Sequence, residues 1–159
     1  MSNDEPGAEP GTFELGTDGP TAILVGVDDT VTATRAGWYA AGLARRQRAR
    51  LIAVYVAPLG TAIGASSVGA AVLAAEAQAH DEIAAEMRER IVGAVQELGI
   101  AIDFIVAHGD AYTEIKRIAD ETRADAIVVG ASQKAGHRLI GSLAVRLVRA
   151  GKWPVTVVP

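Results

Sequence analysis

The sequence contains no cysteine. This absence excludes a disulfide-stapled scaffold, thiolate-bound zinc and a cysteine nucleophile. The three histidines, His80, His108 and His137, are widely separated, and none has a second ligand at metal-binding spacing. No Ser/His/Asp arrangement with a recognisable nucleophile turn occurs either. We therefore predict no metal site and no catalytic residue.

The chain has almost no net charge outside its first twenty residues. Those twenty residues carry five acids and no base, which leaves 14 acids and 15 bases in the rest of the chain. A nearly neutral body argues against broad electrostatic capture of nucleic acid. The dense basic run over residues 45–50 follows an alanine-rich helical stretch, where positive charge suits the carboxyl end of the helix dipole.

A targeting or membrane segment is also missing. The amino terminus, MSNDEPGAEP, has acids where a signal peptide needs a basic segment followed by an apolar run, so we expect a cytoplasmic protein. The long uncharged stretch over residues 51–75 is interrupted by Pro58, Gly60, Gly64 and Gly69. This pattern predicts a strand followed by a loop rather than a membrane-spanning helix.

The 159 residues suffice for one ordinary domain, and half of them are apolar. Residues 1–19 are rich in glycine, proline and acids and predict a disordered tail, followed by a single domain over residues 20–159. Short apolar runs predict strands over residues 21–27, 51–57, 102–107, 126–130 and 155–158. Helical patterns predict helices over residues 32–47, 75–98, 112–122 and 142–150. This alternation is typical of an α/β fold with a parallel sheet and helices on both faces.

The first of these helices has small residues on its expected inner face. Ala36, Gly37, Ala40 and Ala44 would allow it to approach the sheet closely.

Three features are expected to meet at the carboxyl ends of the strands, where ligands bind in open parallel sheets. Asp28 and Asp29 follow the first strand, and Gly130 closes the fourth. Gly141-Ser142 opens the last helix, where free backbone N–H groups could hold an anion. Taken singly, the glycines fit an ordinary turn and an ordinary helix start equally well.

The joint arrangement resembles the universal stress protein family. The resemblance rests on VGVDDT, on AHGDAYTEIKRIADETRADAIVVG and on GSLAVRLVRAGKWPVTVVP, and it covers residues 21–159. Gly109-Asp110, Ile115, Ala119, Asp125 and Gly130 fall at the family's spacing. The resemblance implies a Rossmann-like, adenine nucleotide alpha hydrolase-like sheet of five strands in the order 3-2-1-4-5. It also implies a homodimer acting in the stress response and, in one branch, an ATP site.

The resemblance assigns roles to individual positions. Val27, Asp28 and the backbone of Leu51 would lie near the adenine, and Gly130 along the ribose. The residues assigned to the phosphates are Gly141, Ser142 and Leu143, and Mg²⁺ would be bound only together with ATP. The ATP-binding branch has the pattern G-x2-G-x9-G-(S/T), but here Gln133 stands at the second glycine and only seven residues then precede Gly141. Glycine permits close approach to a phosphate, so this departure bears directly on the ligand.

Three interpretations of the pocket remain open. It could bind ATP, with at most weak hydrolysis or autophosphorylation on Ser142. It could take another adenine nucleotide, such as a cyclic one, because a shorter phosphate loop suits a smaller anion. The protein could instead belong to the non-ATP-binding branch and act through protein partners.

The last strand, Val155–Val158, has no charged residue and is an uncovered edge by sequence. In the family, the corresponding strand pairs with its mate in a homodimer. We therefore expect a homodimer through this strand.

A phosphoacceptor receiver domain is the rival interpretation from another class of protein. Asp28 and Asp29 would hold Mg²⁺, and Asp110, after the third strand, would accept the phosphoryl group. A receiver also needs a lysine just beyond the last strand, where this chain has only Pro159. That difference counts against the receiver interpretation.

Overall fold

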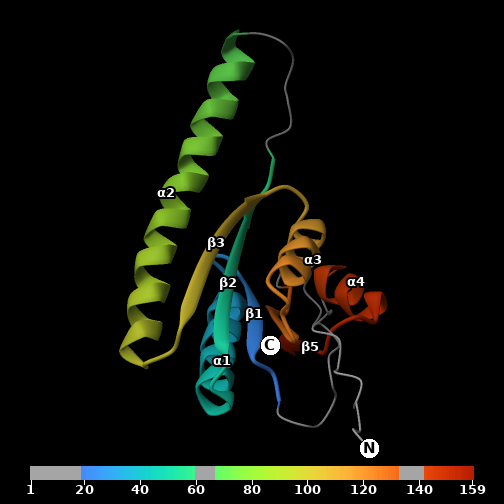
Figure 1. Ribbon diagram of the computed structural model, residues 1–159. Coiled ribbons are helices and arrows are strands. Elements are labelled where there is room, and N and C mark those ends of the chain that lie inside the picture. The colour runs from blue at the N-terminus through green and yellow to red at the C-terminus, as the bar shows by residue number, and fades with distance from the viewer. Residues whose placement is uncertain (1–18, 60–66, 133–141) are drawn as a thin grey trace, which may run out of the picture.

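The computed structural model of the protein describes residues 19–59, 67–132 and 142–159. Five parallel strands form one sheet in the order β3-β2-β1-β4-β5, which confirms the predicted fold class (Figure 1). The strands are β1 (Ala22–Val27), β2 (Arg50–Ala57), β3 (Ile102–His108), β4 (Ala126–Gly130) and β5 (Val155–Val158). The helices are α1 (Val31–Gln47), α2 (Ser67–Glu97), α3 (Ala111–Glu121) and α4 (Ser142–Ala150).

Helices cover both faces of the sheet, and each face has its own apolar cluster. Alternate β1 residues point to opposite faces, as the pleat of a strand requires. Ile23 and Val25 pack with α1 and α2, whereas Leu24 packs with α3 and α4. All three side chains are fully buried. Strands covered on both faces explain why the sequence shows continuous apolar runs rather than alternation.

Helix α1 lies close to the sheet because its inner face carries only small side chains. Ala36, Ala40 and Ala44 are completely buried, as the sequence predicts. Thr30 caps the amino end: its side-chain oxygen accepts a hydrogen bond from the backbone N–H of Ala33 at 3.1 Å. At the other end, Arg48 adopts a left-handed conformation that stops the helix.

Helix α2 begins at Ser67, so residues 67–74 are helical where the sequence predicted a loop. Alanine has the highest helix propensity, and three of the residues 67–74 are alanine, so intrinsic propensity favours extending the amphipathic second half of α2 toward Ser67. The first turns stand clear of the sheet (Figure 1). There Val68 and Val72 stand at the helical spacing of four but are 72% and 43% exposed, so they do not form a packed face.

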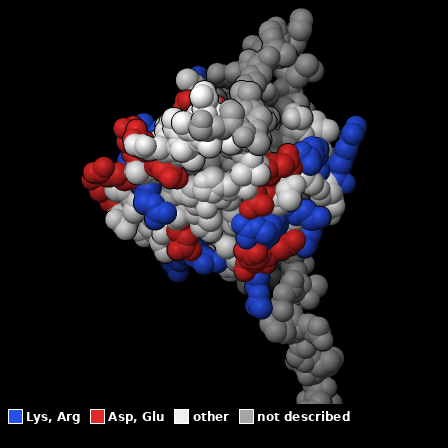
Figure 2. Space-filling view, turned by 90° about the horizontal axis from the view of Figure 1, so that it is seen from above, with Lys and Arg blue, Asp and Glu red and all other residues white. Residues whose placement is uncertain are grey.

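Acidic and basic side chains lie beside one another on the face shown in Figure 2. Within α3, for example, Arg117 pairs with both Glu114 and Glu121 at 2.7 Å. Along the three described stretches, no helix has both the length and the apolar character needed to cross a bilayer.

Candidate functional site

The carboxyl ends of β1 and β4 lie side by side at the point where strand order reverses. Strand β1 pairs with β2 on one side, and on the other it pairs with β4, Val25 lying opposite Val128. The chain leaves β1 at Asp28 and β4 at Gly130. A crevice at this place in a parallel sheet is the usual ligand site.

A chain of hydrogen bonds shapes this edge of the sheet. The Oδ1 atom of Asp28 accepts from the backbone N–H of Thr30 at 2.8 Å and from its hydroxyl at 2.5 Å. The buried hydroxyl of Thr32 donates to the carbonyl of Ala131 at 2.7 Å, which ties α1 to the end of β4. The second carboxylate oxygen of Asp28 has no hydrogen-bond partner among the described residues, and it faces solvent. It is free to accept a hydrogen bond from a ligand.

The predicted site residues of the first two strands lie at different depths. Val27 ends β1, and Asp28 follows it. Leu51 pairs with Ile23 near the start of β2, four positions before Tyr55, which pairs with Val27. The Leu51 backbone therefore lies toward the amino end of the sheet, away from Asp28. Tyr55 is the β2 residue level with the end of β1.

The last helix contributes the other predicted residues. Ser142 is the first residue of α4 and is exposed, so its hydroxyl is accessible beside the free N–H groups of the first turn. Leu143 is half-buried and packs with the apolar cluster on the α3/α4 face. Gln133 and Gly141 lie outside the described residues. Gly130 packs against the first turn of α1 with no room for a side chain.

Tyr55 is a feature of this edge that the sequence did not reveal. Its hydroxyl is hydrogen-bonded to Nδ1 of His80 at 3.0 Å, which links β2 to α2. Burial raises the pKa of Tyr55, and the negative charges of Asp29 and Asp28 raise it further. The hydroxyl therefore stays protonated through the neutral range. No local pattern signals this contact, because it depends on where the long helix α2 crosses the sheet.

Asp110 does not join the acids that follow β1. Strand β2 stands between β3 and β1, whereas a receiver domain has its third strand next to its first. The carboxylate instead caps α3, where it accepts from the backbone and hydroxyl of Thr113, and it pairs with Arg146 at 3.0 Å. These contacts, the Arg146 hydrogen bond foremost, lower the pKa of Asp110 to about 2. The strand order and these contacts argue against the receiver interpretation.

Asp125 lies at the amino ends of the strands, on the far side of the sheet from Asp28. Its Oδ2 atom accepts from the backbone N–H groups of Thr21 and Ala22 and from the Thr21 hydroxyl, at 2.8–2.9 Å. Asp125 therefore joins the starts of β1 and β4 and has a structural role. Nowhere in residues 19–59, 67–132 and 142–159 do three His, Asp or Glu side chains gather as a metal site would require.

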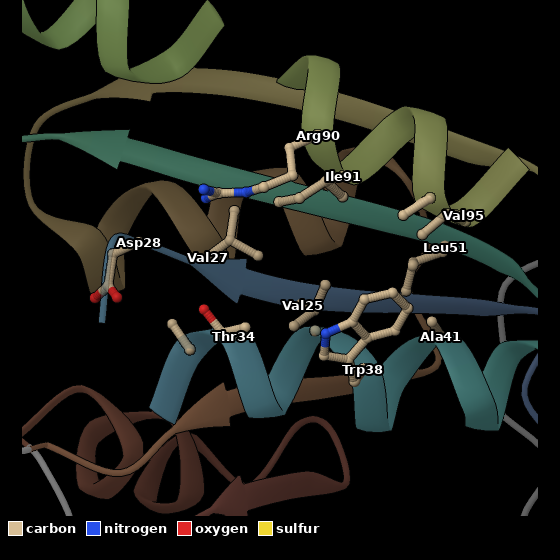
Figure 3. A pocket seen from close by; sticks show the side chains of 13 residues that line it. Val25, Val27, Asp28, Thr34, Trp38, Ala41, Leu51, Arg90, Ile91 and Val95 are labelled. Atoms are coloured by element: carbon tan, nitrogen blue, oxygen red, sulfur yellow. The ribbon is translucent and has the colours of Figure 1, made fainter. Parts of the chain in front are cut away.

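A groove of about 120 Å³ opens between α1 and α2 on one face of the sheet (Figure 3). It extends from Asp28 at one end to Leu51 at the other, with Val25 and Val27 on its floor. Trp38 from α1 and Arg90 from α2 form its walls.

The fold defines a parallel α/β protein whose strand order reverses between β1 and β4, the place where such sheets usually bind ligands. Residues 21–159 match the sequence model of the Universal stress protein family, and the chain belongs to this family. A universal stress protein of Methanocaldococcus jannaschii is 28% identical over 138 residues, which are 86% of this chain and 80% of that protein.

Solved structures share the fold. The universal stress protein UspA from Lactobacillus plantarum is 28% identical with a TM-score of 0.71, and the match covers 87% of this chain and 97% of that one. A universal stress protein in complex with cAMP is 23% identical with a TM-score of 0.66, covering 88% and 97%. One from Archaeoglobus fulgidus in complex with dAMP is 22% identical with a TM-score of 0.61, covering 87% and 98%.

Proposed function

We propose that this protein is a stress-response module that binds an adenine nucleotide in the crevice at the ends of β1 and β4. The observation that carries the proposal is the orientation of the Asp28 carboxylate, which hydrogen bonds from Thr30 fix at the end of β1. Its Oδ1 atom is fixed by Thr30, while its other oxygen faces the crevice edge without a described partner. The relatives whose structures contain cAMP and dAMP support an adenine nucleotide as the ligand.

Each part of the crevice has a distinct task in this proposal. Asp28 accepts a hydrogen bond from the ribose or the adenine, and Val27 supplies apolar contact below it. Ser142 and the first N–H groups of α4 hold the phosphate, since a helix amino terminus attracts anions. Gln133 and Gly141 belong to the phosphate segment that the family resemblance assigns. With ATP, Mg²⁺ would neutralise part of the phosphate charge.

The number of phosphates is the finer part of the proposal. The segment between Gly130 and Gly141-Ser142 is two residues shorter than the ATP-binding pattern of the family, and Gln133 replaces its second glycine. A shorter segment with a side chain at that position offers fewer backbone N–H groups at contact distance. We therefore expect nucleotides with one phosphate to bind more tightly than ATP.

Calorimetric titration with cAMP, AMP, and ATP with and without Mg²⁺ tests the proposal, after mass spectrometry has checked for co-purified nucleotide. Micromolar binding of at least one of these nucleotides is expected. Asp28→Asn should weaken it by about tenfold, because a charged acceptor is lost while the contact with Thr30 is preserved. Asp29→Asn is the matched control, since it removes the same charge one residue further on. Absence of binding at millimolar concentration of every nucleotide would overturn the proposal and favour action through protein partners.

We further propose that two copies pair through β5. Pro154 and Val158 direct their carbonyl groups to β4. Alternate residues of a parallel strand face opposite sides, so Val155 and Val157 direct their backbone groups outward. An uncharged edge strand of this kind is a natural pairing surface.

Substitution of Val157 tests the pairing. Val157→Pro removes the outward N–H group and should shift the sedimentation coefficient from dimer to monomer at micromolar concentration. Val157→Ala controls for lost packing, because it keeps the N–H group and should remain dimeric. A wild-type protein that sediments as a monomer at all concentrations would overturn the pairing.

A further inference from the structure

The groove between α1 and α2 is a recess lined mainly by apolar side chains. Val25 and Leu51 form its floor and are only 1% exposed. From α1 it is bounded by Ala33, Gly37 and Ala41, which follow one another at the helical spacing of four. A Cβ atom added at Gly37 would meet nothing within 4 Å. The volume of about 120 Å³ is close to that of engineered apolar cavities, ~150 Å³, that hold a benzene molecule.

An aromatic side chain forms one wall of the groove. Trp38 lines the recess yet is 57% exposed, with its indole ring lying along the groove above α1 (Figure 3). An aromatic ring placed in the recess would cover the indole face and remove apolar surface from water. Aromatic pairs of this kind are favoured beyond the burial of area alone.

A cation without a partner stands over the same recess. The side chain of Arg90 runs along the groove above Val27, toward Asp28 (Figure 3). Its guanidinium makes no ion pair or hydrogen bond with any residue in the described part of the chain. Asp28 is the acidic group that faces this end of the groove, but its Oδ1 atom is engaged by Thr30.

We propose that this groove binds a small aromatic carboxylate, with its ring against Trp38 and its carboxylate on Arg90. The guanidinium matches a carboxylate with two parallel hydrogen bonds. Asp28 repels a doubly charged phosphate more strongly than a singly charged carboxylate, so the groove selects one negative charge. The groove shares Val27 and Asp28 with the proposed nucleotide crevice, but Trp38 and Arg90, which would hold the aromatic carboxylate, have no part in nucleotide binding, so this proposal does not depend on the proposed function.

The test uses 4-fluorobenzoate as the probe, observed by ¹⁹F NMR and by the fluorescence of Trp38 in the Trp153→Phe background. The chain has only these two tryptophans, so the remaining signal belongs to the groove. We expect saturable binding of 4-fluorobenzoate, with 4-fluorobenzamide about tenfold weaker because it lacks the charge. Arg90→Gln should abolish this preference for the acid over the amide.

Two glycines provide a matched pair of filling variants. Gly37→Leu places a side chain in the recess and should eliminate binding while the protein stays folded, because the position has open space around it. Gly93→Leu on α2 also meets open space but lies outside the groove, so binding should be unchanged. Thermal unfolding of both variants verifies folding.

Asp28→Asn separates this site from the nucleotide crevice. The substitution should strengthen 4-fluorobenzoate binding by removing repulsion, whereas it should weaken nucleotide binding. Equal binding of acid and amide, binding that survives Gly37→Leu, or no binding at 10 mM probe, on the order of the weakest specific affinities, would each overturn the proposal.

Discussion

A Cβ atom at Gly130 would lie 2.7 Å from the backbone nitrogen of Ala33. Real side chains do not approach a backbone atom this closely, so the end of β4 touches the first turn of α1 only because residue 130 is glycine. The backbone carbonyl group of Thr32 lies equally near. The glycine that the family resemblance assigns to a ribose is therefore required by the packing of the fold itself.

Gly130→Ala should destabilise the protein by about 1–3 kcal/mol, the usual cost of forcing extra atoms into a packed contact. Urea unfolding followed by circular dichroism measures the change. Gly93→Ala is the control, because Gly93 lies in α2 with open space around it. That variant should gain about 0.5–1 kcal/mol from the better helix propensity of alanine. A Gly130→Ala protein as stable as the wild type would contradict the packing argument.

Thr32→Val should cost about 1–3 kcal/mol, because it leaves the carbonyl of Ala131 without its partner at a buried position. Thr32 is 6% exposed, so water cannot readily replace the lost hydroxyl. The change in the midpoint of urea unfolding is the measurement. Thr34→Val, on the exposed side of the same helix, should change stability by about 0.5 kcal/mol or less. Similar losses for both variants would show that the Thr32 hydroxyl has no special role.

Asp125→Ala should weaken the junction between β1 and β4 by about 1–3 kcal/mol, since three donors lose their common acceptor. Asp125→Asn retains an acceptor oxygen and should lose less. Because Asp125 lies at the amino edge of the sheet, neither variant should alter the affinity for nucleotide or for 4-fluorobenzoate. Ligand titration of the folded variants checks this expectation, and a selective loss of binding would refute a purely structural role.

Asp110 predicts a specific dependence of stability on pH. Its pKa is lowered from an ordinary 3.8 to about 2, so the carboxylate stabilises the folded state fully above about pH 4. That contribution is lost as the pH falls through about 2. Solvent exposure limits it to about 1 kcal/mol or less.

Asp110→Asn keeps a good capping residue but cannot carry charge, so its stability should fall less than that of the wild type between pH 4 and pH 2. Parallel thermal unfolding of the two proteins over this range isolates the effect from other carboxyl groups. Identical pH profiles would show that the pair with Arg146 contributes nothing in solution.

The parts of the fold that sequence predicts well are those in which burial in the core sets the pattern of apolar residues. The strand over Ala126–Gly130 is an unbroken apolar run because both sides are covered, and its bounds were predicted without error. The start of α2 was missed because Ser67 and the alanines after it carry no period. The contact between Tyr55 and His80 was also missed, since it joins residues 25 positions apart.

Glycines show the same limit at the site. Gly37 was expected to let α1 approach the sheet, as the buried alanines of that face do. In the structure it instead borders open space in the groove. Gly130, by contrast, has no free space at all. A glycine in a sequence specifies that a side chain is absent, and only the packed neighbours decide whether the space is used.

The exposed valines in the first turns of α2 have a consequence for how the helix opens. Residues near Ala84, Met87 and Val95 are anchored in the core, whereas Val68 and Val72 are exposed. Amide protons of the first turns should therefore exchange with solvent through local fraying, while those of the anchored turns should exchange only when the whole domain unfolds. Helix α2 is continuous in its backbone geometry, yet it comprises two segments with separate free energies of opening.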